Sequence, residues 1–228
     1  MKQRVFGLIS WLMCMLCAAA VAAAPADVDQ ARLRVLLSVA CMASYEDRNG
    51  QIADGYLTAG GWSVDRYAKI AGDVSADWLV ARKRQDGTDH FLLAVAGTSD
   101  MKDVRLDLKM KQVPYGGDSP ESFREAAERP AAKDDPAEMR VHKGFNKLVD
   151  VLLTVEVKTD SGTMRPLIDI LRENEESEVY LTGHSLGGAA VTILGARLRD
   201  MGIRSDRIHI MTFGAPAVGN APFARTYA

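Results

Sequence analysis

A serine stands between two glycines in the segment Gly183-His-Ser-Leu-Gly187. This G-x-S-x-G pattern is typical of a nucleophile elbow, a sharp strand-to-helix turn that pushes the serine Oγ out above a sheet. The pattern is short, so it needs structural context. An apolar, β-prone run precedes it and a helix-compatible run follows it. We therefore predict that Ser185 is a nucleophile, and the alternative is a glycine-rich turn that serves only packing.

A nucleophilic serine also needs donors for the negative charge that develops on the substrate's carbonyl oxygen. One is the backbone N–H of Leu186, at the amino end of the predicted helix. The other should come from the end of an earlier strand. Gly97-Thr98 follows the apolar run 91–96, and Thr98 can offer both its N–H and its hydroxyl. On spacing alone, a Gly-Thr turn with a local hydroxyl cap explains this segment equally well.

The elements around this serine follow from the apolar patterns. The run 178–182, the helix-compatible run 186–200 and the run 207–213 predict a strand, a helix and a strand. That order indicates a right-handed βαβ unit with parallel strands, whose carboxyl ends are the expected site of chemistry. We further predict a helix over 32–45, a hairpin over 78–96 that turns at Asp86-Gly87, a loop over 114–140, and apolar periodic segments over 145–157 and 164–171.

The amino-terminal residues resemble a signal peptide. Lys2 and Arg4 precede a charge-free run from Val5 to Ala24 that ends in small residues. We expect residues 1–26 to be removed on export to the periplasm or outside, leaving one domain over 27–228 and no stable membrane span. A retained membrane anchor is the alternative.

The whole composition excludes several classes of partner. The chain has 28 basic and 30 acidic residues among 228, so no nucleic-acid partner is indicated. Beyond the leader, Cys41 is the lone cysteine, and no internal disulfide is expected. Because the histidines are scattered and Cys41 has no partner, we predict neither a metal site nor a cofactor.

Several segments together resemble the class 3 (fungal-type) lipases, a branch of the α/β-hydrolases. They are Ala94-Val-Ala-Gly-Thr98, Asp103-Val-Arg-Leu-Asp-Leu108, Val141-His-Lys-Gly-Phe145, the elbow, and Thr212-Phe-Gly-Ala-Pro-Ala-Val-Gly-Asn220 with Phe223. The resemblance implies a mixed, mostly parallel sheet flanked by helices, with Ser185 as nucleophile and with Thr98 and Leu186 as oxyanion donors. It also implies hydrolysis of lipid esters, as a triacylglycerol lipase, an esterase or a phospholipase-like enzyme. The alternative is a non-catalytic protein of this fold with a binding role.

The resemblance also implies a lid and shows two departures from the family. Residues 99–111 correspond to the lid, with Met101, Val104 and Leu108 on one helical face. The remaining positions are strongly charged, so we expect only moderate interfacial activation. The alternative is an ordinary surface helix. The sequence also departs from the family at Ala96 and Ala217, where the family often has Arg, and this could alter how the oxyanion loop is braced.

The base that should activate Ser185 is not evident. In the family the acid and the histidine follow the serine, beyond the Phe-Gly-x-Pro turn. His209 is the only histidine after Ser185, and it lies about 13 Å below the elbow at a rise of about 3.3 Å per residue. His184 should point away from Oγ, His142 belongs to a motif that supports the fold, and His90 begins a strand at the opposite end. We therefore expect a truncated chain whose Asp and His lie beyond residue 228, and the alternative is a degenerate member.

Overall fold

The computed structural model describes residues 25–71, 74–97, 111–132, 135–159 and 161–227. The chain divides into two compact units, Met1–Leu36 and Leu37–Ala228. Of the first unit, only the beginning of helix α2 (Pro25–Ala43) is described. The predicted signal peptide therefore lies almost wholly outside the described residues. Within the described ranges, no helix combines the length and the apolar content that crossing a membrane requires.

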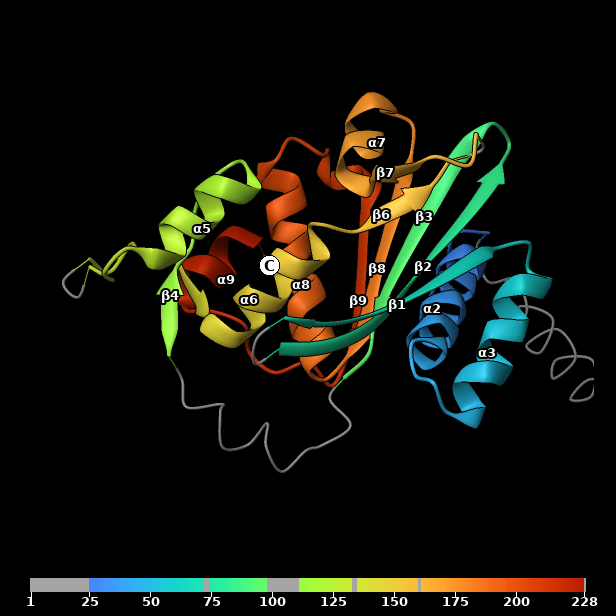
Figure 1. Ribbon diagram of the computed structural model, residues 1–228, viewed down its shortest axis with the longest axis horizontal. Helices are drawn as coiled ribbons and strands as arrows, with labels where there is room; N and C mark the ends of the chain where they lie inside the picture. The colour runs from blue at the N-terminus through green and yellow to red at the C-terminus, as the bar shows by residue number, and fades with distance from the viewer. Residues whose placement is uncertain (1–24, 72–73, 98–110, 133–134, 160, 228) are drawn as a thin grey trace, which may run out of the picture. The chain divides into compact units, whose positions relative to one another are not determined.

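The second unit is built on a five-stranded mixed sheet (Figure 1), with strand order β1-β2-β3-β8-β9. The pairs β1/β2 and β2/β3 are antiparallel, whereas β3/β8 and β8/β9 are parallel. The predicted parallel unit is therefore confirmed, and it occupies one half of the sheet. The strands are β1 (Ser63–Ala71), β2 (Val74–Gln85), β3 (Thr88–Val95), β8 (Glu178–His184) and β9 (Ile208–Phe213).

The hairpin between β2 and β3 forms as predicted. Asp86 and Gly87 both have positive φ, at 50° and 85°. Two consecutive positive φ angles are the requirement of a type I′ turn, whose twist matches that of paired strands. The strand β1 was missed, because its sequence SVDRYAKIA lacks a strong alternation of apolar and polar residues.

Helices cover both faces of the sheet within this unit. Helix α8 (Leu186–Asp200), with α6 (Lys143–Leu152) beside it, packs on one face. The main core lies between this layer and the sheet, and it includes Phe91, Leu93, Val179, Leu181, Leu148, Val149, Val191 and Leu194. Against the opposite face lie helix α3 (Arg48–Ala59) and the last turns of α2, where the Thr182 hydroxyl donates to the Leu37 carbonyl at 3.2 Å.

The prediction of a loop over 114–140 is wrong, because helix α5 (Pro120–Glu128) forms there. Ser119 caps it through the N–H of Ser122, and Pro120 occupies the first turn, where no N–H is needed. The residue three places after the cap is serine instead of the usual Glu or Gln, so the capping box is easily overlooked. Phe123 is buried on this helix and fixes it against the core.

The periodic segments 145–157 and 164–171 each divide into a helix and a short strand. Helix α6 is followed by β6 (Glu156–Lys158), and β7 (Met164–Pro166) leads into α7 (Leu167–Glu173). The remaining short elements are β4 (Gln112–Pro114), which pairs with β5 (Arg140–His142), the 3-10 turn η1 (Ser205–Arg207) and α9 (Ala221–Tyr227).

Candidate active site

Ser185 occupies the junction between β8 and α8. Its backbone angles are φ 52° and ψ −119°, a conformation that costs a non-glycine residue roughly 1–3 kcal/mol. The Ser185 N–H donates to the Phe213 carbonyl of β9 at 2.9 Å, and its own carbonyl accepts from the Ala189 N–H at 3.1 Å. The residue is partly exposed. The structure therefore has the strained strand-to-helix turn that the G-x-S-x-G pattern predicts.

Glycines around Ser185 allow three backbones to approach closely. A Cβ on Gly187 would lie 2.2 Å from the Val95 carbonyl oxygen at the end of β3. A Cβ on Gly183 would lie 2.5 Å from the Gly187 carbonyl carbon. Real Cβ atoms essentially never approach other atoms so closely. The small residues are therefore required by the packing of α8 across β3 and β8.

The predicted oxyanion donors differ in how far they can be placed. Leu186 is the first residue of α8, where N–H groups have no partner within the helix. Gly97, which follows β3, lies beside the elbow, since a Cβ there would be 2.9 Å from the His184 carbonyl oxygen. Thr98 and most of the predicted lid, residues 99–110, lie outside the described residues. Their roles stay predictions.

The four histidines are bonded away from Ser185. Their hydrogen-bond partners are the Tyr180 hydroxyl for His90 (3.2 Å), the Gly144 N–H for His142 (3.2 Å), the Tyr45 hydroxyl for His184 (2.8 Å) and the Glu178 carboxylate for His209 (2.6 Å). None of these contacts reaches the Ser185 hydroxyl in the part of the chain that the structure describes. His209 lies opposite Tyr180 in the β8/β9 register, well before the carboxyl ends of these strands.

His142 caps the amino end of α6. Its Nδ1 accepts from the Gly144 N–H, and its ring lies 4.3 Å from the ring of Phe145, measured between centroids. Its Nε2 is buried without a hydrogen-bond partner. Burial lowers the pKa of His142, so the ring is held neutral and serves as a capping acceptor.

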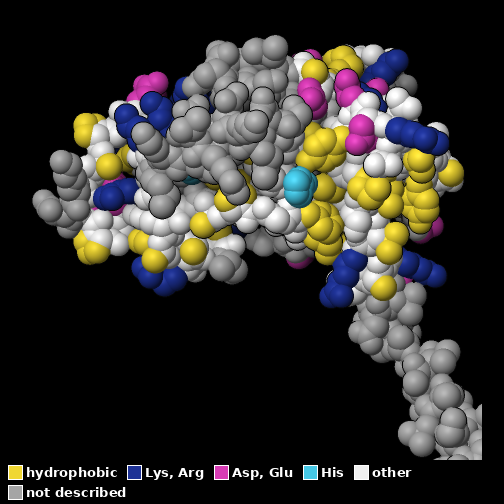
Figure 2. Space-filling view, turned by 90° about the horizontal axis from the view of Figure 1, so that it is seen from below, with side chains coloured by type: hydrophobic (Ala, Val, Ile, Leu, Met, Phe, Trp, Pro, Cys, Tyr) yellow, Lys and Arg dark blue, Asp and Glu magenta, His cyan; other side chains and the backbone are white. Residues whose placement is uncertain are grey.

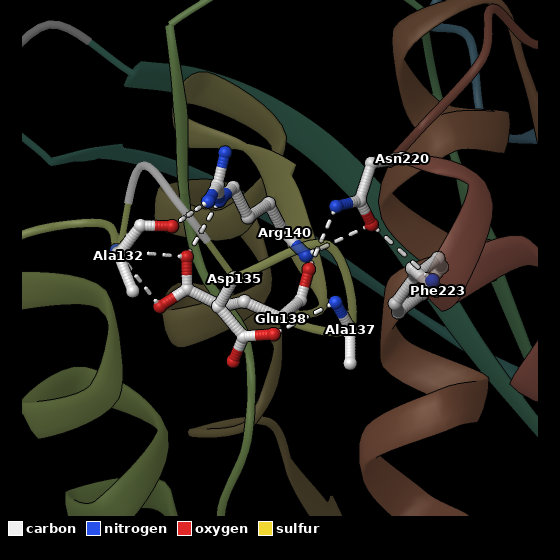
Figure 3. A network of polar contacts seen from close by, with 7 residues as sticks. All are labelled: Ala132, Asp135, Ala137, Glu138, Arg140, Asn220 and Phe223. Carbon is white, nitrogen blue, oxygen red and sulfur yellow. Dashed lines mark hydrogen bonds and ion pairs between the residues drawn. The ribbon is translucent and has the colours of Figure 1, made fainter.

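Asn220, the last residue of the motif Thr212-Phe-Gly-Ala-Pro-Ala-Val-Gly-Asn220, holds the chain after β9 in place (Figure 3). The motif itself did not predict this role. The Asn220 side-chain oxygen accepts from the N–H groups of Arg140 (3.1 Å) and Phe223 (3.2 Å), and its amide donates to the Glu138 carbonyl at 2.8 Å. The guanidinium of Arg140 in turn pairs with the Glu138 carboxylate at 2.6 Å. This network joins the turn after β9 to β5, and so joins two of the quoted motifs.

A cavity of about 360 Å³ opens beside the elbow. It is mainly apolar and is lined by Ser38, Cys41, Met42, Tyr45, Asp47, Asn49, His184 and Phe213. Figure 2 shows a histidine at the surface beside a group of hydrophobic side chains. Burial raises the pKa of Cys41 to about 11, so its thiol is a poor nucleophile. The described ranges contain no group of three side chains suited to hold a metal ion.

Comparisons with known proteins agree with this geometry. The family model described as "Lipase (class 3)" matches residues 92–228. A lipase from Caenorhabditis elegans is 49% identical over 51 residues, which cover 22% of this chain and 14% of that protein. Phospholipase A1-II 1 from Oryza sativa subsp. indica is 27% identical over 183 residues, which cover 72% of this chain and 42% of the rice protein.

The fold is also that of solved lipases. The crystal structure of a lipase from Rhizopus microsporus var. chinensis superposes with a TM-score of 0.58 at 20% identity, covering 90% of this chain and 63% of the fungal one. The chain thus spans less than two thirds of each of these relatives. With the family model matching more than half of its length, the chain belongs to the class 3 lipase family.

Proposed function

We propose that this protein is a serine carboxylester hydrolase that acts on lipid esters through an acyl-enzyme at Ser185. The observation that carries the proposal is the conformation of Ser185, with φ at 52°, partly exposed and at the amino end of α8. Membership of the class 3 lipases supports a lipid ester as the substrate. Whether this is a triacylglycerol, a phospholipid or a smaller ester is a question for assay.

In the proposed reaction, the Ser185 Oγ attacks the ester carbonyl carbon while a base takes its proton. The carbonyl oxygen becomes negative and accepts hydrogen bonds from the Leu186 N–H and from Thr98. The bond to the alcohol then breaks, and the alcohol leaves with the proton that the base returns. Water attacks the acyl-enzyme in the same way and releases the fatty acid. The fixed N–H groups at the start of α8 need no reorganisation during these steps.

We do not assign the base to any of the four histidines, because each is hydrogen-bonded to a group other than Ser185. The acid that would orient this base is then not assigned either. We propose that both are encoded after residue 228. This assignment is in line with the chain's coverage of only 42% of the rice phospholipase and 63% of the fungal lipase. Because no histidine is bonded to Ser185 among the described residues, the alternative is a non-catalytic hydrolase-fold protein that retains only a binding role.

Labelling with a fluorophosphonate distinguishes the proposed hydrolase from the non-catalytic alternative, because the reagent reacts with an activated serine. The 228-residue protein and the product of the full reading frame are compared, each with a matched Ser185→Ala control. We expect the longer protein to be labelled rapidly at Ser185 and the shorter one slowly. Rapid labelling of both would place the base within these 228 residues. Absence of labelling, together with no Asp and His in the downstream frame, would favour the binding role.

We also propose export and contact with a lipid–water interface. If the leader is cleaved as proposed, the mass of the exported protein should correspond to loss of residues 1 to about 26. An intact amino terminus in the membrane fraction would instead support an anchor. Activity on a soluble ester should rise only modestly at its solubility limit, and a sharp rise would contradict moderate interfacial activation.

A further inference from the structure

One phenol hydroxyl connects the two chain segments on which the proposed chemistry depends. Tyr45 follows the end of α2, and its hydroxyl accepts a hydrogen bond from the Gly97 N–H at 2.9 Å. The same hydroxyl lies 2.8 Å from Nδ1 of His184, the residue immediately before Ser185. Gly97 immediately precedes Thr98. Tyr45 therefore joins the end of β3 to the end of β8, next to the nucleophile in sequence.

The donors and acceptors in this contact decide which way each hydrogen bond runs. A backbone N–H is only a donor, so the Tyr45 oxygen accepts from Gly97 and its own hydrogen is free to be donated. Nδ1 of His184 can accept that hydrogen when the ring carries its proton on Nε2. Burial raises the pKa of Tyr45, so the phenol stays protonated at neutral pH. In that tautomer, the order is Gly97 N–H to Tyr45 O–H to His184 Nδ1.

The sheet does not hold Gly97 in place. Strand β3 ends at Val95, and the Ala96 N–H still donates to the Asp77 carbonyl of β2 at 2.9 Å. At Gly97 the backbone donor turns instead to the Tyr45 side chain. The Tyr45 hydroxyl is thus the acceptor of the last backbone N–H that the structure describes before Thr98.

Space around Gly97 is equally restricted. A Cβ there would lie 2.8 Å from the Tyr45 hydroxyl, 2.9 Å from the His184 carbonyl oxygen and 3.2 Å from His184 Nδ1. The glycine, the phenol and the imidazole are therefore in mutual contact, and a displacement of one is transmitted to the others.

We propose that Tyr45 is a positioning residue, whose hydroxyl fixes Gly97, the residue before the proposed donor Thr98, relative to the elbow at Ser185. Its effect on turnover rests on the proposed function. A donor misplaced by about 1 Å can lower the rate by about 100-fold, because the oxyanion exists only in the transition state. Tyr45→Phe should therefore lower kcat by about tenfold or more and leave KM within about twofold.

The test uses Tyr45→Phe with Tyr67→Phe as a matched control. Tyr67 also donates through its hydroxyl, to the Glu156 carbonyl at 2.9 Å. Tyr67→Phe therefore also removes a phenol hydroxyl that is hydrogen-bonded to the backbone, but one outside the proposed site. Amide exchange of Gly97 and the 15N shift of His184 Nδ1, measured by NMR, report the contact without requiring activity. We expect Gly97 exchange to accelerate at least about tenfold in Tyr45→Phe alone, with the Nδ1 resonance moving toward that of an unbonded nitrogen.

The effect on kcat and KM is measured with the product of the full reading frame and a soluble short-chain ester. Unchanged Gly97 exchange in Tyr45→Phe would refute the proposal, and so would faster exchange with an unchanged kcat. An equal fall in kcat for Tyr67→Phe would show a general loss of stability instead. A wild-type protein that neither hydrolyses esters nor labels at Ser185 would refute the proposed function alone, and Gly97 exchange would still decide whether Tyr45 holds this turn.

Discussion

The close approach of α8 to β3 can be tested by replacing Gly187 with alanine. The new methyl group would lie 2.2 Å from the Val95 carbonyl oxygen and 2.6 Å from that of Ala96. Both are backbone atoms of a buried strand end, so the helix itself must move. Overpacking a core costs about 1–3 kcal/mol. We therefore expect a loss of about 2 kcal/mol, which for a domain of this size lowers the melting temperature by about 4–8 °C.

The same substitution in the same helix supplies the control. A Cβ on Gly195 would lie 2.3 Å from Cδ1 of Ile210, the far end of a side chain that is 44% exposed and can rotate away. Alanine also favours a helix interior by about 1 kcal/mol over glycine. Gly195→Ala should therefore be close to neutral in urea unfolding and should leave Ser185 labelling unchanged. Equal stability of the two variants would refute the argument from backbone contact.

Three further predictions concern single buried or partly buried side chains. Arg197 is fully buried and donates to Asp150 at 2.7 Å, so Arg197→Ala should cost about 3 kcal/mol in urea unfolding; an unchanged midpoint would contradict this. Burial, with a hydrogen bond to Asp200, raises the pKa of Tyr227 to about 12. Because the unfolded value is about 10, this stabilisation is complete below pH 10 and is lost as pH rises toward 12. Tyr227→Phe should weaken this dependence but not abolish it, because burial also raises the pKa of Tyr115. With a pKa of about 11, Cys41 should react with iodoacetamide at pH 8 much more slowly in the folded than in the unfolded protein, as peptide mapping would show.

The region around Ser185 could be predicted because its signals are local. A β-prone run, a serine flanked by glycines and a long apolar run fall in one continuous stretch, and the structure places β8 and α8 there. The β2/β3 turn could be predicted for the same reason, because the pair Asp86-Gly87 favours the positive φ angles that the turn requires. Where a short segment determines its own conformation, the sequence is sufficient.

The contact of Tyr45 with His184 could not be found this way, since it joins residues 139 positions apart. Nothing near Tyr45 marks its hydroxyl as a partner for Gly97. Asn220 was visible in a quoted motif, yet two of its three hydrogen bonds, with Arg140 and Glu138, depend on β5 lying beside the turn after β9. Such side chains acquire their roles only when the sheet has brought distant segments together.

These contacts explain how a strained serine can persist. A conformation that costs roughly 1–3 kcal/mol needs neighbours that leave the chain no easier alternative. At Ser185 the backbone N–H is held by Phe213 of β9, and the carbonyl is held by the first turn of α8. Gly187 lets that turn lie against β3, so relaxing Ser185 would move the helix off the sheet. The strain is thus maintained by core packing, and for this reason Gly187→Ala should reduce both stability and Ser185 labelling.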